Sequence, residues 1–189
     1  MPGTQEDIID DLVAQHQQIK LLFAQVATAP AEHKQQLFQE LVGLLAIHES
    51  VEESFVHPMA ERELRDAQAV VSPRIVEEQD AKQALTHLYE LGVREPRFDT
   101  ELAALRDAVT AHAEAEEEME FGQLRQMVEP ERLQRMVATM EAAAMLSGTR
   151  STARSNAPSD LLAGPPAAVF DRVRDGLRDA VQAGAGRAR

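Results

Sequence analysis

The chain contains no cysteine and no tryptophan, and aromatic residues make up only 4% of its 189 residues. Without cysteine, disulfides, thiolate zinc sites, iron–sulfur clusters and cysteine nucleophiles are all excluded. Any metal that the protein binds must therefore be held by histidine, carboxylate and water. The chain also lacks long runs of β-branched or aromatic residues, which argues against a β-sheet protein.

Basic residues are few as well, because 19 Lys and Arg stand against 32 Asp and Glu, for a net charge of −13. Binding to DNA or RNA depends largely on clustered Lys and Arg that face the phosphates, so the composition predicts no nucleic-acid partner. No apolar run approaches the roughly 20 residues of a membrane span. The first residues, MPGTQEDIID, do not form a signal peptide. These features predict a cytoplasmic protein without stable membrane insertion.

The residues that are abundant, Ala, Leu, Glu, Gln and Arg, favour helix. Apolar residues recur at helical spacing in four long stretches. Thr4 is the expected N-cap of the first stretch, Ser72 and Pro73 are the expected start of the third, and Gly92 is its expected end. We therefore predict an all-α protein, built as an up-down four-helix bundle with extra C-terminal helices. The four stretches cover about residues 5–27, 31–57, 73–91 and 99–128.

Composition divides the chain into three parts. Residues 1–146 hold the bundle and a shorter helix from about Pro130 to Met145. Residues 147–168 are rich in Ser, Gly, Pro and Ala, which predicts a flexible linker. Residues 169–189 predict an amphipathic C-terminal helix or tail, with apolar residues on one side and Arg and Asp on the other. This helix would dock on the bundle itself or on a protein partner.

Two of the predicted helices share the pattern H-x-x-x-E-E. The second contains His48 and Glu52, and the fourth contains His112 and Glu116. Residues four apart lie on the same face of a helix, about 6 Å apart along its axis, so each imidazole and carboxylate can converge on one ion. The first helix adds His16 beside its apolar stripe. When such helices face each other in a bundle, two carboxylates can bridge two metal ions.

The spacing alone is a weak signal. His57 and Glu61 are also four residues apart, but Pro58 lies between them and disturbs the helix. The prediction of a metal site therefore depends on two such pairs on separate long helices, together with a third histidine on another helix.

These segments resemble the hemerythrin-like HHE cation-binding family. EDIIDDLVAQHQQIKLLFAQV looks like the first helix of that family, HESVEESFVHP is similar to its second-helix motif, and HAEAEEEMEF is similar to its fourth-helix motif. The resemblance covers about residues 5–128 and implies a four-helix bundle with a non-haem di-iron site. In that site Glu52 and Glu116 would bridge the irons, His16 and His48 would serve one iron, and His112 would serve the other.

The chain departs from the family pattern in two places. The family usually supplies a histidine from the third helix, where this chain has Glu78 followed by Gln79. The apolar residues further along the helix place Glu78 at the inward position, and a register shifted by one residue would place Gln79 there instead. The family's tyrosine before proline is His57 here, which would be an extra ligand or would contact the ligands. The predicted metal ligands are His16, His48, Glu52, Glu78, His112 and Glu116.

A site richer in carboxylate stabilises the ferric state of iron, which argues against reversible O2 carriage. Reaction with O2 or H2O2, redox or oxygen sensing, and iron handling are the functions that the resemblance then implies, with catalase-like or Fe(II)-oxidising activity as the enzymatic forms. Zinc or manganese would fit the same donors in place of iron. The alternative is a metal-free helical protein that acts through interaction or regulation.

Overall fold

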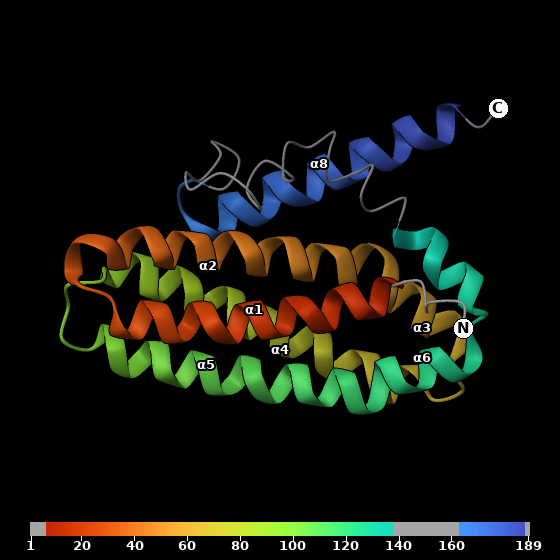
Figure 1. Ribbon diagram of the computed structural model, residues 1–189, viewed down its shortest axis with the longest axis horizontal. Helices are drawn as coiled ribbons and strands as arrows, with labels where there is room; N and C mark the ends of the chain where they lie inside the picture. The colour runs from red at the N-terminus through yellow and green to blue at the C-terminus, as the bar shows by residue number, and fades with distance from the viewer. Residues whose placement is uncertain (1–6, 138–162, 188–189) are drawn as a thin grey trace, which may run out of the picture.

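The structure, a computed structural model, describes residues 7–137 and 163–187, and its described residues form helices without any strand (Figure 1). The prediction of an all-α protein is confirmed. The helical elements are α1 (Ile8–Thr28), α2 (Ala31–Val51), the π-helical turn η1 (Glu52–Val56), α3 (His57–Glu63), α4 (Ala67–Leu91), α5 (Phe98–Ala115), the π-helical turn η2 (Glu116–Phe121), α6 (Gly122–Met127) and α8 (Pro166–Arg187), and residues 130–137 are also helical.

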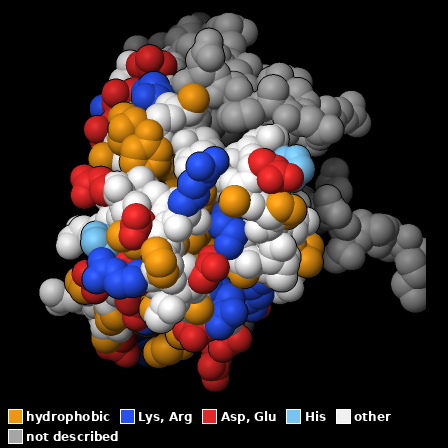
Figure 2. All heavy atoms as spheres, turned by 90° about the vertical axis from the view of Figure 1, so that its left-hand side faces the viewer, with side chains coloured by type: hydrophobic (Ala, Val, Ile, Leu, Met, Phe, Trp, Pro, Cys, Tyr) orange, Lys and Arg blue, Asp and Glu red, His pale blue; other side chains and the backbone are white. Residues whose placement is uncertain are grey.

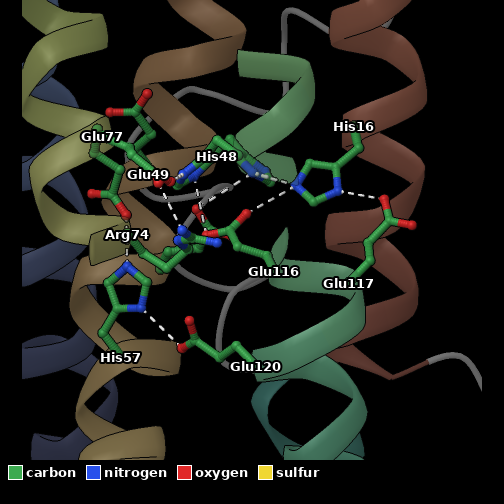
Figure 3. A network of polar contacts seen from close by, with 12 residues as sticks. His16, His48, Glu49, His57, Arg74, Glu77, Glu116, Glu117 and Glu120 are labelled. Carbon is green, nitrogen blue, oxygen red and sulfur yellow. Dashed lines mark hydrogen bonds and ion pairs between the residues drawn. The ribbon is translucent and has the colours of Figure 1, made fainter. Parts of the chain in front are cut away.

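Helices α1, α2, α4 and α5 form the bundle, and each runs opposite to the helix before it (Figure 1). Short connections join α1 to α2 and α4 to α5 at one end of the bundle, as expected for antiparallel neighbours. Figure 2 looks onto this end, where acidic, basic and hydrophobic side chains are interspersed. The functional residues lie away from this end, in the interior between the four helices (Figure 3).

Large apolar side chains fill the bundle on either side of a polar layer. Near the connections, the rings of Phe38 and Phe98 meet edge to face with centroids 5.3 Å apart, and both side chains are fully buried. Within the polar layer, Phe121 stacks on the imidazole of His16 at 5.9 Å. Burying each such ring stabilises the fold by about 1.5–3 kcal/mol, which offsets the cost of placing polar groups between them.

The start of α1 differs from the prediction. Asp7 is the N-cap, because its carboxylate accepts hydrogen bonds from the backbone N–H groups of Ile9 and Asp10 at 2.9 and 3.0 Å. The carboxylate of Asp10 accepts in return from the N–H of Asp7 at 3.1 Å. This reciprocal pair is a capping box, so the prediction of Thr4 as the cap is wrong. Thr4 itself lies outside the described residues.

The start of the third bundle helix was also predicted wrongly. Helix α4 begins at Ala67, and Pro73 lies inside it. A proline inside a helix loses one backbone hydrogen bond, but Val70 and Val71 are buried ahead of it, and their burial favours extending the helix. The predicted end is confirmed, since Gly92 has φ 82° and donates its N–H to the carbonyl of Leu88 at 3.0 Å.

Both H-x-x-x-E-E segments contain a π-helical turn. Helix α2 continues through η1 into α3, so the predicted interruption at Pro58 is wrong. Pro58 lies in the first turn of α3, where a proline is tolerated best. Helix α5 continues through η2 into α6 in the same way. Such turns are rare and often lie at functional sites.

The C-terminal helix packs on the bundle. Helix α8 begins at Pro166, inside the segment predicted as a linker, and lies against α2 and α4 (Figure 1). Its buried side includes Val169, Phe170 and Val173, and Gln39 on α2 donates to the carbonyl of Gly164 at 3.1 Å. Residues 138–162, which include most of the predicted linker, lie outside the described residues. None of the described helices is long and apolar enough to cross a membrane.

Candidate metal centre

The first group of candidate ligands joins helices α1, α2 and α5 through their polar layer. The Nε2 atoms of His16 and His48 are 3.0 Å apart. Glu116 Oε2 lies 3.4 Å from His16 Nε2, and Glu52 Oε2 lies 3.4 Å from His48 Nε2. Donor atoms from all four side chains lie within 4.8 Å of one another, and the four side chains are buried. The arrangement is that of a closed set of nitrogen and oxygen donors.

A second group shares two residues with the first. Glu52, Glu78, His112 and Glu116 again offer one donor atom each, all within 4.8 Å of one another. His112 Nε2 lies 3.1 Å from Glu116 Oε1. The structure therefore brings all six predicted residues together, with Glu52 and Glu116 common to both groups. Their direct bonding to a metal stays a prediction.

The structure decides the register of α4. Glu78 is 1% exposed and lies in the second group, whereas Gln79 is exposed on the other side of the helix. The inward position predicted from Ala81, Leu85 and Leu88 is therefore correct, since all three are also buried.

The two carboxylates that both groups share each lie where an α-helix passes into a π-helical turn. Glu52 opens η1 and Glu116 opens η2, while His48 and His112 lie in the last turn of the preceding α-helix. A π-helical turn inserts an extra residue and rotates the residues after it relative to their positions in a regular α-helix. The two segments have the same H-x-x-x-E-E sequence and the same backbone change, so they present their carboxylates to the interior in matching ways.

The carboxylates of this cluster lack enough protein donors, which is the observation that tests whether a metal fits. Among the described residues, both oxygens of Glu52, both of Glu116 and Oε2 of Glu78 are buried without a hydrogen bond. A buried carboxylate without a partner is costly, and a bound cation would supply the missing positive charge. The donor set of imidazole nitrogen and carboxylate oxygen suits iron, manganese or zinc. The residues present therefore fit a metal ion.

The two bridging candidates differ in their electrostatics. Burial, together with the negative charge of Glu116, raises the pKa of Glu52 well above its ordinary value. Burial also acts to raise the pKa of Glu116, but its contacts with His112 and His16 outweigh that and lower the pKa instead. Burial and the neighbouring His16 lower the pKa of His48 to about 3. Without metal, Glu52 therefore keeps its proton to a higher pH than Glu116 does.

Each of the three histidines turns Nε2 toward the shared carboxylates and Nδ1 toward an outer partner, as Figure 3 shows for His16 between Glu116 and Glu117. An acceptor at Nδ1 fixes the tautomer that leaves Nε2 free to bind a metal. The sequence pattern gave no sign of these partners, among them Glu117, which is 34% exposed and contacts His16. The Nδ1 contacts are His16 with Glu117 at 2.8 Å, His48 with Gln15 at 3.0 Å and His112 with Glu77 at 2.9 Å.

His57 connects the cluster to a further buried carboxylate. Its Nε2 lies 2.6 Å from Glu78 Oε1, and its Nδ1 lies 3.0 Å from Glu120 Oε1. Burial acts to lower the pKa of His57, but these two hydrogen bonds outweigh it and raise the pKa to about 10. The expectation that His57 lies at a helix C-terminus is wrong, because it begins α3 within a continuous helical run. Its contact with Glu78 leaves only Oε2 of that carboxylate facing the centre.

Lys82 lies between the cluster and α8. Its ammonium lies 3.3 Å from Glu49 Oε2 and 3.9 Å from Glu78 Oε2, and it also bonds Glu53. Burial raises the pKa of Glu49 to about 8, although Lys82 opposes the shift. The ring of Phe170 on α8 lies 5.2 Å from the ammonium. Sequence spacing gave no sign of Glu49 or Glu120, because neither lies four residues after a histidine of the cluster.

Comparison with known proteins supports the fold and gives the family. The family model described as hemerythrin HHE cation binding domain matches residues 7–124. The crystal structure of a hemerythrin HHE cation binding domain-containing protein from Mycobacterium kansasii is similar, with a TM-score of 0.69 and 20% sequence identity over 88% of this chain and 99% of that one. No curated protein sequence matches. The chain belongs to the hemerythrin HHE cation binding domain family.

Proposed function

We propose that this chain holds two metal ions, iron in the cell, between its four bundle helices and uses them in reaction with O2 or H2O2. The observation that carries the proposal is that Glu52 and Glu116 belong to both groups of donors. A carboxylate shared in this way can hold two ions close together, as in other helix-bundle di-metal sites. Zinc or manganese would occupy the same donors when iron is scarce.

The residues around the cluster would prepare it for such ions. Three imidazoles are held with Nε2 inward, and three carboxyl groups, from η1, α4 and η2, face the same centre. Bound iron would supply one-electron redox steps and a Lewis acid. A cavity lined by His48, Glu78 and His112 reaches the cluster from between α4 and α5, which would admit a small oxidant such as O2 or H2O2.

A second candidate function is metal or redox sensing without turnover. It is favoured by the contact between Phe170 on α8 and Lys82, since Lys82 also reaches Glu78 in the cluster. Metal binding would then change the charge around Lys82 and with it the docking of α8 on the bundle or on a protein partner. A third form of the proposal is iron handling, in which the chain binds iron but neither reacts with an oxidant nor signals.

The test is a metal analysis of the purified protein paired with one matched variant. Glu116→Gln removes a shared carboxylate that is fully buried, whereas Glu118→Gln changes an exposed carboxylate in the same turn. We expect about two iron ions per chain in the unchanged protein and in Glu118→Gln, and at most one in Glu116→Gln. Peroxide consumption by the loaded protein would separate catalysis from sensing. If the purified protein holds no metal and its melting temperature is unchanged by iron or by chelators, the result would instead support a metal-free protein that acts through interaction.

A further inference from the structure

A groove of about 400 Å³ runs between α4 and α5 and ends at the metal cluster. On α5 its lining follows one face of the helix from Glu101 to His112. The eleven steps from Glu101 to His112 span about 16 Å at 1.5 Å per residue, so the groove is longer than the cluster is wide. His48, Glu49 and Glu78 line it at the inner end.

The groove exists because small side chains face each other across the seam. Ala81 and Ala84 line it from α4, and Ala104 and Ala108 line it from α5. Ala104 and Ala108 are exposed to solvent, so the groove opens along α5 to the surface. Larger side chains at these positions would have filled the space, as they do elsewhere in the bundle core.

The space is far larger than O2 or H2O2 requires. A water molecule takes up about 30 Å³ in the liquid, and O2 and H2O2 are only slightly larger. Sites for small organic ligands occupy about 300–1,000 Å³ and are mostly apolar, with a few polar groups at one end. The groove matches that range in volume, and nine of its 17 lining residues are apolar.

The charge around the groove limits what it can hold. Glu77, Asp80 and Glu101 stand among its lining residues, and no Lys or Arg of the described chain does. Glu77 pairs with Arg74 at 2.7 Å and Glu101 with His87 at 2.8 Å. Asp80 is therefore the rim carboxylate that would repel an anionic ligand such as a fatty acid, since like charges in a partly desolvated site destabilise binding. A neutral ligand would not.

We propose that this groove binds a neutral, mainly apolar organic molecule, with one polar end at the metal cluster and the apolar part along the facing alanines. The claim that this molecule is a substrate rests on the function proposed above. The claim that it binds rests on the groove alone. Oε2 of Glu49, on a lining residue, is buried without a hydrogen bond and lies 3.3 Å from the Lys82 ammonium. It would accept a hydrogen bond from a hydroxyl or hydroperoxyl end.

The test compares a neutral and an anionic probe of equal chain length. We expect titration calorimetry of the full chain to show saturable binding of 1-octanol and at least tenfold weaker binding of octanoate. Ala108→Phe, which fills the groove from an exposed position, would weaken octanol binding at least tenfold. Ala111→Phe is the matched control, because Ala111 is exposed on the same helix and does not line the groove. Asp80→Lys would strengthen octanoate binding.

Equal octanol affinity in Ala108→Phe and in the unchanged protein would overturn the proposal, as would the absence of octanol binding. If Ala108→Phe instead changes the sedimentation coefficient, a second copy of the chain covers the groove and the proposal is wrong. Measuring bound metal in the same samples keeps the two proposals apart. Octanol binding without metal would contradict only the proposed function, and metal without octanol binding would contradict only the groove.

Discussion

Replacing His57 with phenylalanine probes the most tightly bonded part of the buried network. Phenylalanine keeps a flat aromatic ring, slightly larger than imidazole, but removes both nitrogen contacts, at 2.6 Å to Glu78 and 3.0 Å to Glu120. The two carboxylates are 1% and 0% exposed, so water cannot replace the lost partner. A hydrogen bond to a charged group contributes about 1.5–3 kcal/mol, and breaking a buried ion pair costs about 3–5 kcal/mol.

We therefore expect His57→Phe to lower the free energy of unfolding of the metal-free protein by about 3–5 kcal/mol at pH 7. The corresponding fall in melting temperature is about 6–20 °C for a chain of this size. Denaturant titration after chelator treatment measures the first quantity. His33→Phe is the control, because His33 is exposed on α2 and an exposed substitution changes stability by about 0.5 kcal/mol or less.

The same substitution has a predicted pH dependence. The pKa of His57 is raised from 6.5 to about 10 in the folded protein. A raised pKa stabilises the fold fully below the unfolded value and loses that effect as the pH rises through the folded value. The difference between the unchanged protein and His57→Phe should therefore be largest near pH 6 and shrink by pH 10. A difference under about 0.5 kcal/mol at pH 7, or one that grows toward pH 10, would refute the reasoning.

Three further results are expected. Metal binding near pH 7 should release protons, because Glu52 with its raised pKa and His112 with a pKa of about 9 must both lose a proton to become ligands. Calorimetry in two buffers of different ionisation enthalpy measures the number of protons released. For the same reason the metal affinity should rise between pH 6 and 9. Glu117→Gln should weaken metal binding by about 10–100-fold through the orientation of His16, measured by chelator competition, while equal affinities would show that this contact does not matter. Phe170→Ala should lower the free energy of unfolding by about 3 kcal/mol, and an unchanged denaturation midpoint would mean that α8 contributes nothing to the bundle.

The sequence by itself determined the helices and the candidate ligands. Helical periodicity is local, so the four stretches and the end of the third at Gly92 could be read without knowing what packs against them. The spacing of four residues between His48 and Glu52, and between His112 and Glu116, is also local, because one helix face carries both members of each pair. The inward position of Glu78 was inferred from the apolar residues one and two turns later.

Only the tertiary structure decided what surrounds those residues. The partners of His57 lie 21 and 63 residues away in the chain, and no spacing rule connects positions on different helices. The helical start at Ala67 ahead of Pro73 depended on burial against other helices, which outweighs a local proline cost of about 3 kcal/mol. The groove between α4 and α5 likewise exists only where alanines of two helices face each other. Packing between helices sets these features, whereas the sequence signals act within one helix.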